Sequence, residues 1–161
     1  MKRIIIALCI ALIGITGAFA QKKGDFAIGV NLGVAPNLEK DLSVTNFGLG
    51  LKVQYNITNP IRLEAGGDYW FRNNLNDMAD AYVNFNYLFN VGSRFKLYPL
   101  VGVGYAKYGI KDHHKNGVLV NVGVGGEFPF TSHFSAGVEV KYQYIKQFQR
   151  IPISIGATYR F

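Results

Sequence analysis

The chain has 161 residues, a formal net charge of +7 and 49% hydrophobic residues, with a single cysteine. This length suits one domain, and one cysteine excludes a disulfide framework. The mildly basic balance is compatible with acidic lipid or glycan partners.

Residues 1–20 are predicted to be a secretory signal peptide, cleaved before the fold begins. Lys2 and Arg3 give a positive start, residues 4–15 are apolar, and residues 18–20 form a small-x-small cleavage pattern. The alternative is a membrane-anchoring helix. The marginal length of the apolar run and the cleavage pattern after it favour the signal peptide.

The mature chain is then residues 21–161, and loss of Lys2 and Arg3 lowers its formal charge from +7 to +5. Cys9 lies inside the leader, before most of the apolar run, which argues against a lipoprotein. No nucleic-acid partner is expected for an exported chain, and no mature segment approaches the roughly 18 apolar residues of a membrane helix.

Apolar and polar residues alternate through the whole mature chain, which is the period of β-strands with two different faces. Each predicted strand reaches the roughly 9–11 residues that a tilted membrane strand needs. Short turns alternate with longer, more polar segments, as in outer-membrane barrels, where the short turns are periplasmic. The predicted strands cover about 25–35, 46–57, 61–71, 80–91, 95–106, 117–128, 134–144 and 151–161.

One face of these strands is apolar at almost every position, whereas the other carries glycines and charges. A soluble barrel with the apolar face inside is the alternative. The interior of an eight-stranded barrel is too narrow for so many bulky side chains, but it accommodates the glycine-rich face. The predicted lumen charges are Lys52, Arg62, Glu64, Asp68, Asp80, Lys96, Glu127, Glu139, Lys141 and Arg160.

The fold class predicted from these patterns is all-β: an eight-stranded, antiparallel, up-and-down transmembrane barrel. Aromatic residues near both ends of the strands match interfacial girdles. Pro99 fits least well, because proline cannot donate a ladder hydrogen bond and a closed barrel has no edge. We therefore expect a bulge or a locally weakened ladder at Pro99.

Three segments, residues 60–67, 98–105 and 134–142, resemble the small outer-membrane β-barrel family. That family includes the transmembrane domain of outer-membrane protein A, outer-membrane protein X and the opacity-type porin family. The last seven residues, with Tyr159 and Phe161, are similar to the terminal signal that the barrel-assembly machinery reads. The resemblance implies the outer membrane of a Gram-negative bacterium and a family of adhesins, scaffolds, small pores and a few lipid-modifying enzymes.

The lumen charges are balanced, with five of each sign. Buried charges are tolerated when they pair, whereas a selective pore usually has a surplus of one sign. We therefore predict a closed, ion-paired lumen in a non-enzymatic barrel with a structural or surface-interaction role. A narrow channel for ions or small solutes is the alternative, and a lipid-modifying enzyme is the third hypothesis.

The enzyme hypothesis depends on His133 and Ser135, because a histidine beside a serine can activate it as a nucleophile. Their spacing is similar to that in lipid A deacylases. The pair follows a short, periplasmic turn, and alternation directs Ser135 to the lumen, so we predict no enzyme. His113 and His114 are expected in a solvated loop without a metal, and no cofactor is predicted.

Two of the four longer loops, expected at residues 107–116 and 145–150, carry a basic surplus. Lipopolysaccharide phosphates lie at this height and attract basic side chains. The expected partners are outer-membrane lipid and lipopolysaccharide, with the assembly machinery during biogenesis, and a monomer is expected. The predicted lipopolysaccharide contacts are Lys111, Lys115, Lys146 and Arg150.

Overall fold

The computed structural model describes residues 23–36, 38, 45–71, 77–91, 95–110, 113–146 and 148–161. The predicted signal peptide and Lys111 lie outside these residues. Among the residues that are described, no helix is long and apolar enough to cross a membrane.

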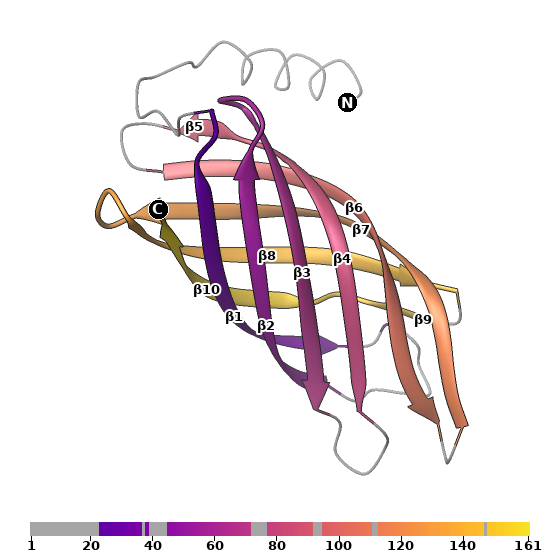
Figure 1. Ribbon diagram of the computed structural model, residues 1–161. Coiled ribbons are helices and arrows are strands. Elements are labelled where there is room, and N and C mark those ends of the chain that lie inside the picture. The colour runs from indigo at the N-terminus through magenta and orange to yellow at the C-terminus, as the bar shows by residue number, and fades with distance from the viewer. Residues whose placement is uncertain are drawn as a thin grey trace, which may run out of the picture.

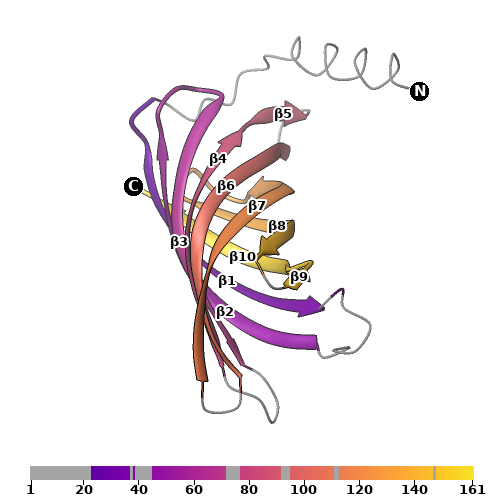
Figure 2. The ribbon, with the colours of Figure 1, turned by 90° about the vertical axis from the view of Figure 1, so that its right-hand side faces the viewer.

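The described chain is a series of antiparallel strands in sequence order, and β10 closes the sheet by pairing with both β1 and β8. Figures 1 and 2 show the resulting barrel, with strands oblique to its long axis and the first and last strands side by side. The strands are β1 (Phe26–Pro36), β2 (Thr45–Asn56), β3 (Ile61–Phe71), β4 (Met78–Tyr87), β5 (Phe89–Val91), β6 (Phe95–Ile110), β7 (His113–Pro129), β8 (Phe134–Ile145), β9 (Phe148–Arg150) and β10 (Ile153–Arg160).

The ten segments form eight barrel strands, because β4–β5 and β9–β10 are each one strand with a local break. The first break is at Leu88, beside Pro99. The register that pairs Leu100 with β4 continues unchanged where Leu97 pairs with β5, so there is no bulge. The N–H of Leu88 instead donates to the carbonyl oxygen of Pro60, at 2.7 Å. The weakened ladder predicted at Pro99 is confirmed.

The second break, at residues 151–152, corrects the predicted loop 145–150. Pro152 has no N–H, yet its carbonyl oxygen accepts a hydrogen bond from the Lys141 N–H at 2.9 Å, so the strand keeps its register across the break. The eighth strand therefore starts at Phe148 rather than at residue 151. Its alternation continues through Arg150, whose side chain is buried.

The predicted loop 107–116 is also wrong. Lys107 and Asn116 are paired residues of one long hairpin. In it, β6 ends at Ile110 and β7 begins at His113. Residues 111 and 112, which separate these strands, lie outside the described residues. Lys115 and Asn116 are neighbours and are both exposed, so the strict alternation is lost at this point of the hairpin.

The two faces have the predicted direction, which contradicts the soluble alternative. Outward side chains are apolar and strongly exposed, as at Leu51 (62%), Val103 (62%) and Ile155 (64%). Inward side chains are mostly polar or charged and buried. A large apolar outer wall is unfavourable in water but is solvated by the hydrocarbon of a membrane.

Candidate functional site: an ion-paired lumen

All ten predicted lumen charges point into the barrel. Nine have buried side chains, and the Arg160 side chain, at the short-turn end, is 18% exposed. Arg150 adds a sixth positive charge that sequence reasoning assigned to an outer loop. The signal that was missed is the two-residue alternation of the strand. Arg150 is separated by an even number of residues from Ser154, Gly156 and Thr158, which face inward on the same strand.

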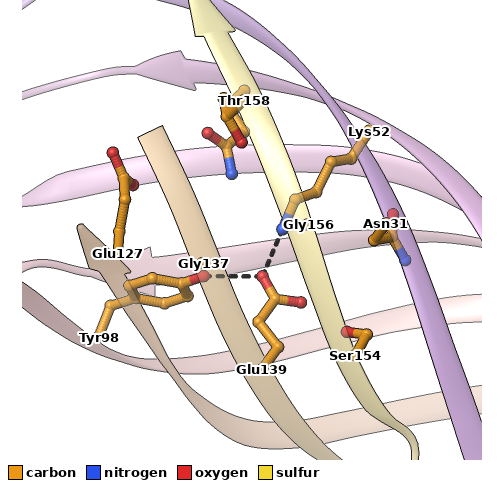
Figure 3. Close-up of a pocket in the computed structure, with 10 residues that line it drawn as sticks. Asn31, Lys52, Tyr98, Glu127, Gly137, Glu139, Ser154, Gly156 and Thr158 are labelled. Carbon is orange, nitrogen blue, oxygen red and sulfur yellow. Dashed lines mark hydrogen bonds and ion pairs between the residues drawn. The ribbon is translucent and has the colours of Figure 1, made fainter. Parts of the chain in front are cut away.

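The middle of the lumen is organised around Glu139 of β8. Lys52 of β2 contacts Glu139 Oε1 at 2.5 Å, and the Tyr98 hydroxyl donates to the same oxygen at 2.8 Å. Figure 3 shows the lysine and the tyrosine converging on this carboxylate from different sides of the barrel. Lys52 also lies 3.2 Å from Glu64 Oε2, so one ammonium group joins two carboxylates.

Glu64 of β3 is fully buried, and its remaining acceptor sites are occupied by amides. Gln54 donates to Oε2 at 2.8 Å, Asn84 donates to Oε1 at 3.0 Å, and Asn86 reaches Oε2 at 3.5 Å. A buried carboxylate is strongly destabilising unless it is paired and hydrogen-bonded. The amides supply those bonds along the wall formed by β2, β3 and β4.

A second cluster lies nearer the short-turn end, around Glu127 of β7. Arg62 donates to Oε2 at 2.8 Å, and Arg160 donates to Oε1 at 3.2 Å. Lys96 is the register partner of Glu127 and is buried, but no described residue forms an ion pair with it within 4.0 Å. Three cationic side chains therefore lie around Glu127, and Asp25 is a second acidic residue whose charge acts on Lys96.

A third cluster lies above the middle of the lumen. Lys141 of β8 reaches Asp68 of β3 at 3.5 Å and Glu139 at 3.8 Å, and its ammonium group lies 4.5 Å from the centre of the Tyr82 ring. The Asn31 side-chain amide also donates a hydrogen bond of 3.0 Å to the Asp68 carboxylate. These contacts join this level of the lumen to the middle cluster.

Arg150 is the centre of the outermost polar cluster. Its guanidinium is fully buried, contacts Asp80 Oδ2 at 2.5 Å and lies 4.6 Å from the centre of the Trp70 ring. Arg150 Nε donates to Gln143 at 2.6 Å, and the Trp70 indole donates to Asp80 at 3.0 Å. A fully buried side chain with these partners is unavailable to lipopolysaccharide, so the predicted contact at Arg150 is wrong.

Four of the ion pairs connect strands that are not neighbours in the sheet: β2 to β8, β3 to β7, β3 to β8 and β4 to β9. They therefore hold opposite or well-separated walls at a fixed distance. The pairs are Lys52–Glu139, Arg62–Glu127, Lys141–Asp68 and Arg150–Asp80.

A cluster of largely apolar side chains fills the lumen toward the long-loop end, next to Arg150. We call this buried cluster the outer cap; its members with the largest side chains come from β3, β4, β6, β7 and β8. Trp70, Leu119 and Ile145 are at most 2% exposed, so large side chains fill the lumen at their level. The outer cap consists of Ala35, Trp70, Met78, Tyr82, Ala106, Tyr108, Leu119 and Ile145.

A small polar chamber of about 20 Å³ lies between the Glu139 and Glu127 clusters. Figure 3 shows its lining, with Lys52, Tyr98 and Glu139 on the walls. The side-chain oxygens of Asn31 and Gln54 also line it and have no hydrogen-bond partner among the described residues. A space of this size and polarity holds about one water molecule.

Inward glycines provide the room for the large polar side chains. A Cβ atom at Gly125 would lie 2.4 Å from the Tyr98 ring, and one at Gly48 would lie 2.4 Å from the Trp70 ring. Both distances are far below van der Waals contact. The glycines therefore allow Tyr98 to reach Glu139 and Trp70 to reach Asp80.

His133 and Ser135 do not form a nucleophilic pair. Ser135 is buried and faces the lumen, whereas His133 is exposed, stacks on Tyr159 and lies 2.9 Å from the Ser132 hydroxyl through Nδ1. The backbones of His113 and His114 lie in β7 rather than in a loop, and their side chains are outside the description. Among the described residues, no group of three or more His, Cys, Asp or Glu side chains is arranged to hold a metal.

The remaining basic side chains predicted to contact lipopolysaccharide are exposed at the long-loop end. Lys115 and Lys146 are both solvent-exposed, as is Lys107 in the same region. At the opposite end, the aromatic residues of the predicted assembly signal project outward: Tyr159 is 38% and Phe161 66% exposed, with ring centres 5.0 Å apart.

Comparisons with known proteins agree with this architecture. Residues 5–161 match the family described as "Outer membrane protein beta-barrel domain". No protein among those with curated functions matches the sequence. Among solved structures, the Neisserial surface protein A has 16% identity and a TM-score of 0.69, covering 86% of this chain and 99% of that one.

Two further structures are similar. The N-terminal β-barrel domain of Pseudomonas aeruginosa OprF has 15% identity and a TM-score of 0.67, covering 84% of this chain and 97% of that one. Ail, the attachment invasion locus protein of Yersinia pestis, in complex with the heparin analogue sucrose octasulfate, has 21% identity and a TM-score of 0.59, covering 86% and 99%. At these identities the likeness shows the fold.

Proposed function

Because the chain belongs to the outer membrane protein β-barrel domain family, with its place in the outer membrane of a Gram-negative bacterium, we propose a non-enzymatic surface role with a closed lumen. The observation that carries this proposal is the outer cap, which lies above a lumen whose five acidic side chains are all ion-paired. Cross-lumen ion pairs make the barrel a rigid support, and its interactions take place at the outer rim.

The partner that we propose at this rim is the phosphate of lipopolysaccharide. Lys107, Lys115 and Lys146 supply exposed ammonium groups at the long-loop end, and charge-assisted hydrogen bonds to phosphate are strong. The described part of this rim offers no matching run of exposed acidic side chains to neutralise them. Ail, a barrel of the same fold, has been crystallised with a sulfated sugar, which is also a polyanion.

The experiment measures lipopolysaccharide association of the refolded barrel by co-sedimentation. Lys115→Glu with Lys146→Glu, with or without Lys111→Glu, is expected to weaken association about tenfold, since two attractive contacts become repulsive. Lys23→Glu, an exposed lysine at the opposite end, is the matched control and leaves association unchanged. Equal association of all variants would refute the lipopolysaccharide proposal.

A narrow channel is the second candidate, and the polar chamber is the observation that favours it. Single-channel recording in a planar bilayer separates the two candidates. A closed lumen gives no conductance steps once insertion is verified. Reproducible steps that change with Lys52→Met or Glu139→Gln would establish the channel and contradict a closed lumen.

During biogenesis, Tyr159 and Phe161 are proposed as the signal for the barrel-assembly machinery. Their exposed rings, in edge-to-face contact at the end of β10, support this proposal. Phe161→Ala is expected to slow assembly into the membrane in cells while leaving refolding in detergent unchanged.

A further inference from the structure

The lipid-facing wall has an apolar groove of about 740 Å³ that crosses β1, β10, β8 and β7. Its floor is made of small residues. Ala136 and Ala157 are register partners on β8 and β10, and Gly126 on β7 lies diagonally from Ala136, beneath the Phe95 ring. Along most of the outer wall the corresponding positions carry large side chains, so the groove is a local depression.

Bulky side chains border this floor. The Phe95 ring lies over Gly126, where an added Cβ atom would be 2.6 Å from the ring. Phe128 borders the floor on β7, and Leu32 and Ile155 border it toward the middle of the membrane. The groove is thus lined almost wholly by hydrocarbon and aromatic carbon.

The groove ends at the aromatic girdle of the short-turn side. Phe134 and Tyr159 meet there edge to face, with ring centres 4.9 Å apart. Beyond them, the exposed turn of residues 130–133 presents the Ser132 hydroxyl and the His133 ring, which stacks on Tyr159. The wall therefore changes from an apolar floor to hydrogen-bonding side chains at the level where lipid headgroups begin.

From this order of surfaces, we propose that the groove is a binding site for one phospholipid of the periplasmic leaflet. One acyl chain lies on Ala136 and Ala157, and the glycerophosphate group lies against Ser132 and His133. The site is independent of the lipopolysaccharide contact proposed at the other end of the barrel.

The shape of the groove favours an acyl chain over a second copy of the protein. Phe95, Phe128, Phe134 and Tyr159 project around the floor and keep the convex wall of another barrel away from the alanines. A flexible chain of methylene groups passes between these rings. Each methylene group that moves from the bilayer interior into close contact with the groove stabilises the bound lipid through dispersion attraction.

The test uses the full mature barrel in vesicles of phosphatidylethanolamine and phosphatidylglycerol. A small fraction of the phosphatidylethanolamine carries a photoactivatable diazirine in one acyl chain. After irradiation, labelled peptides are mapped by mass spectrometry. We expect labelling concentrated on residues 126–138 and 153–159, and Ala136→Phe or Ala157→Phe lowers it about tenfold, the effect of about two lost methylene contacts.

Ala81→Phe is the matched control, because Ala81 is an exposed outward alanine on β4, away from the groove. It leaves the labelling pattern unchanged. Folding of each variant is checked by its gel mobility before and after boiling, and Ala136→Leu replaces Ala136→Phe if the larger side chain prevents folding. Uniform labelling of all strands would overturn the proposal, as would efficient disulfide dimers of Ala136→Cys in the membrane.

Discussion

The two ends of the narrow lumen are filled by different kinds of side chain. The long-loop end is filled by the outer cap, beneath which Arg150 is enclosed by Asp80, Gln143 and Trp70. The short-turn end has the polar chamber and an excess of cations around Glu127. The comparison indicates that large apolar side chains fill the outer end of the lumen, whereas polar and charged side chains line its inner end.

The outer cap should control conductance more than any ion pair does. Trp70→Ala combined with Tyr108→Ala removes two large rings from this level, and we expect conductance steps where the parent barrel is silent. Lys52→Met, in the middle cluster, leaves the cap intact and should give a silent membrane. Planar-bilayer recording distinguishes these outcomes, and steps from Lys52→Met alone would assign the barrier to the middle cluster instead.

Loss of Arg150 should produce the largest change in stability. Arg150→Met leaves Asp80 buried without its cation, which lowers the free energy of unfolding by about 3–5 kcal/mol. Urea unfolding in lipid vesicles measures this change. Arg150→Met with Asp80→Asn removes both charges and should recover much of the loss, whereas Lys146→Met, at an exposed site, should change little. Equal stability of the single variant and its parent would show that Arg150 is solvated.

Replacing an inward glycine should have an intermediate effect on the free energy of unfolding. Gly125→Ala forces the Tyr98 ring away from Glu139 and should lower the free energy of unfolding by about 1–3 kcal/mol. At Gly137 the nearest atom to an added Cβ is the Gly126 carbonyl oxygen, at 3.1 Å, so Gly137→Ala is a milder control. Urea midpoints of the two variants would contradict the packing argument if they were the same.

The pattern of the sequence was sufficient to predict the barrel, the direction of its faces and the inward position of all ten lumen charges. These features depend on alternation along single strands. The partners were not predictable, because Lys52 and Glu139 lie on separated strands and meet only through the register of the closed barrel.

The outer cap and Arg150 were missed for a different reason. Trp70 and Tyr108 have inward parity, but their position at the strand ends is also typical of residues in a girdle or a loop. Pro152 interrupts the pattern next to Arg150 and makes the preceding residues resemble a loop. Continuing the two-residue alternation of the strand through Pro152 would have placed Arg150 in the lumen.

The smallest effect is expected at Lys96, and its sign tests the description of the short-turn end. Lys96 is buried beside Glu127, but Arg62 and Arg160 already occupy both carboxylate oxygens. Lys96→Met therefore removes a desolvated charge without breaking an ion pair, and the free energy of unfolding should stay the same or rise by up to about 1 kcal/mol. Arg62→Met, which breaks the 2.8 Å contact with Glu127, should destabilise the barrel in the same urea assay. A clear loss of stability in Lys96→Met would mean that Glu127 needs all three cations, and that the excess of positive charge at this end contributes to holding the lumen together.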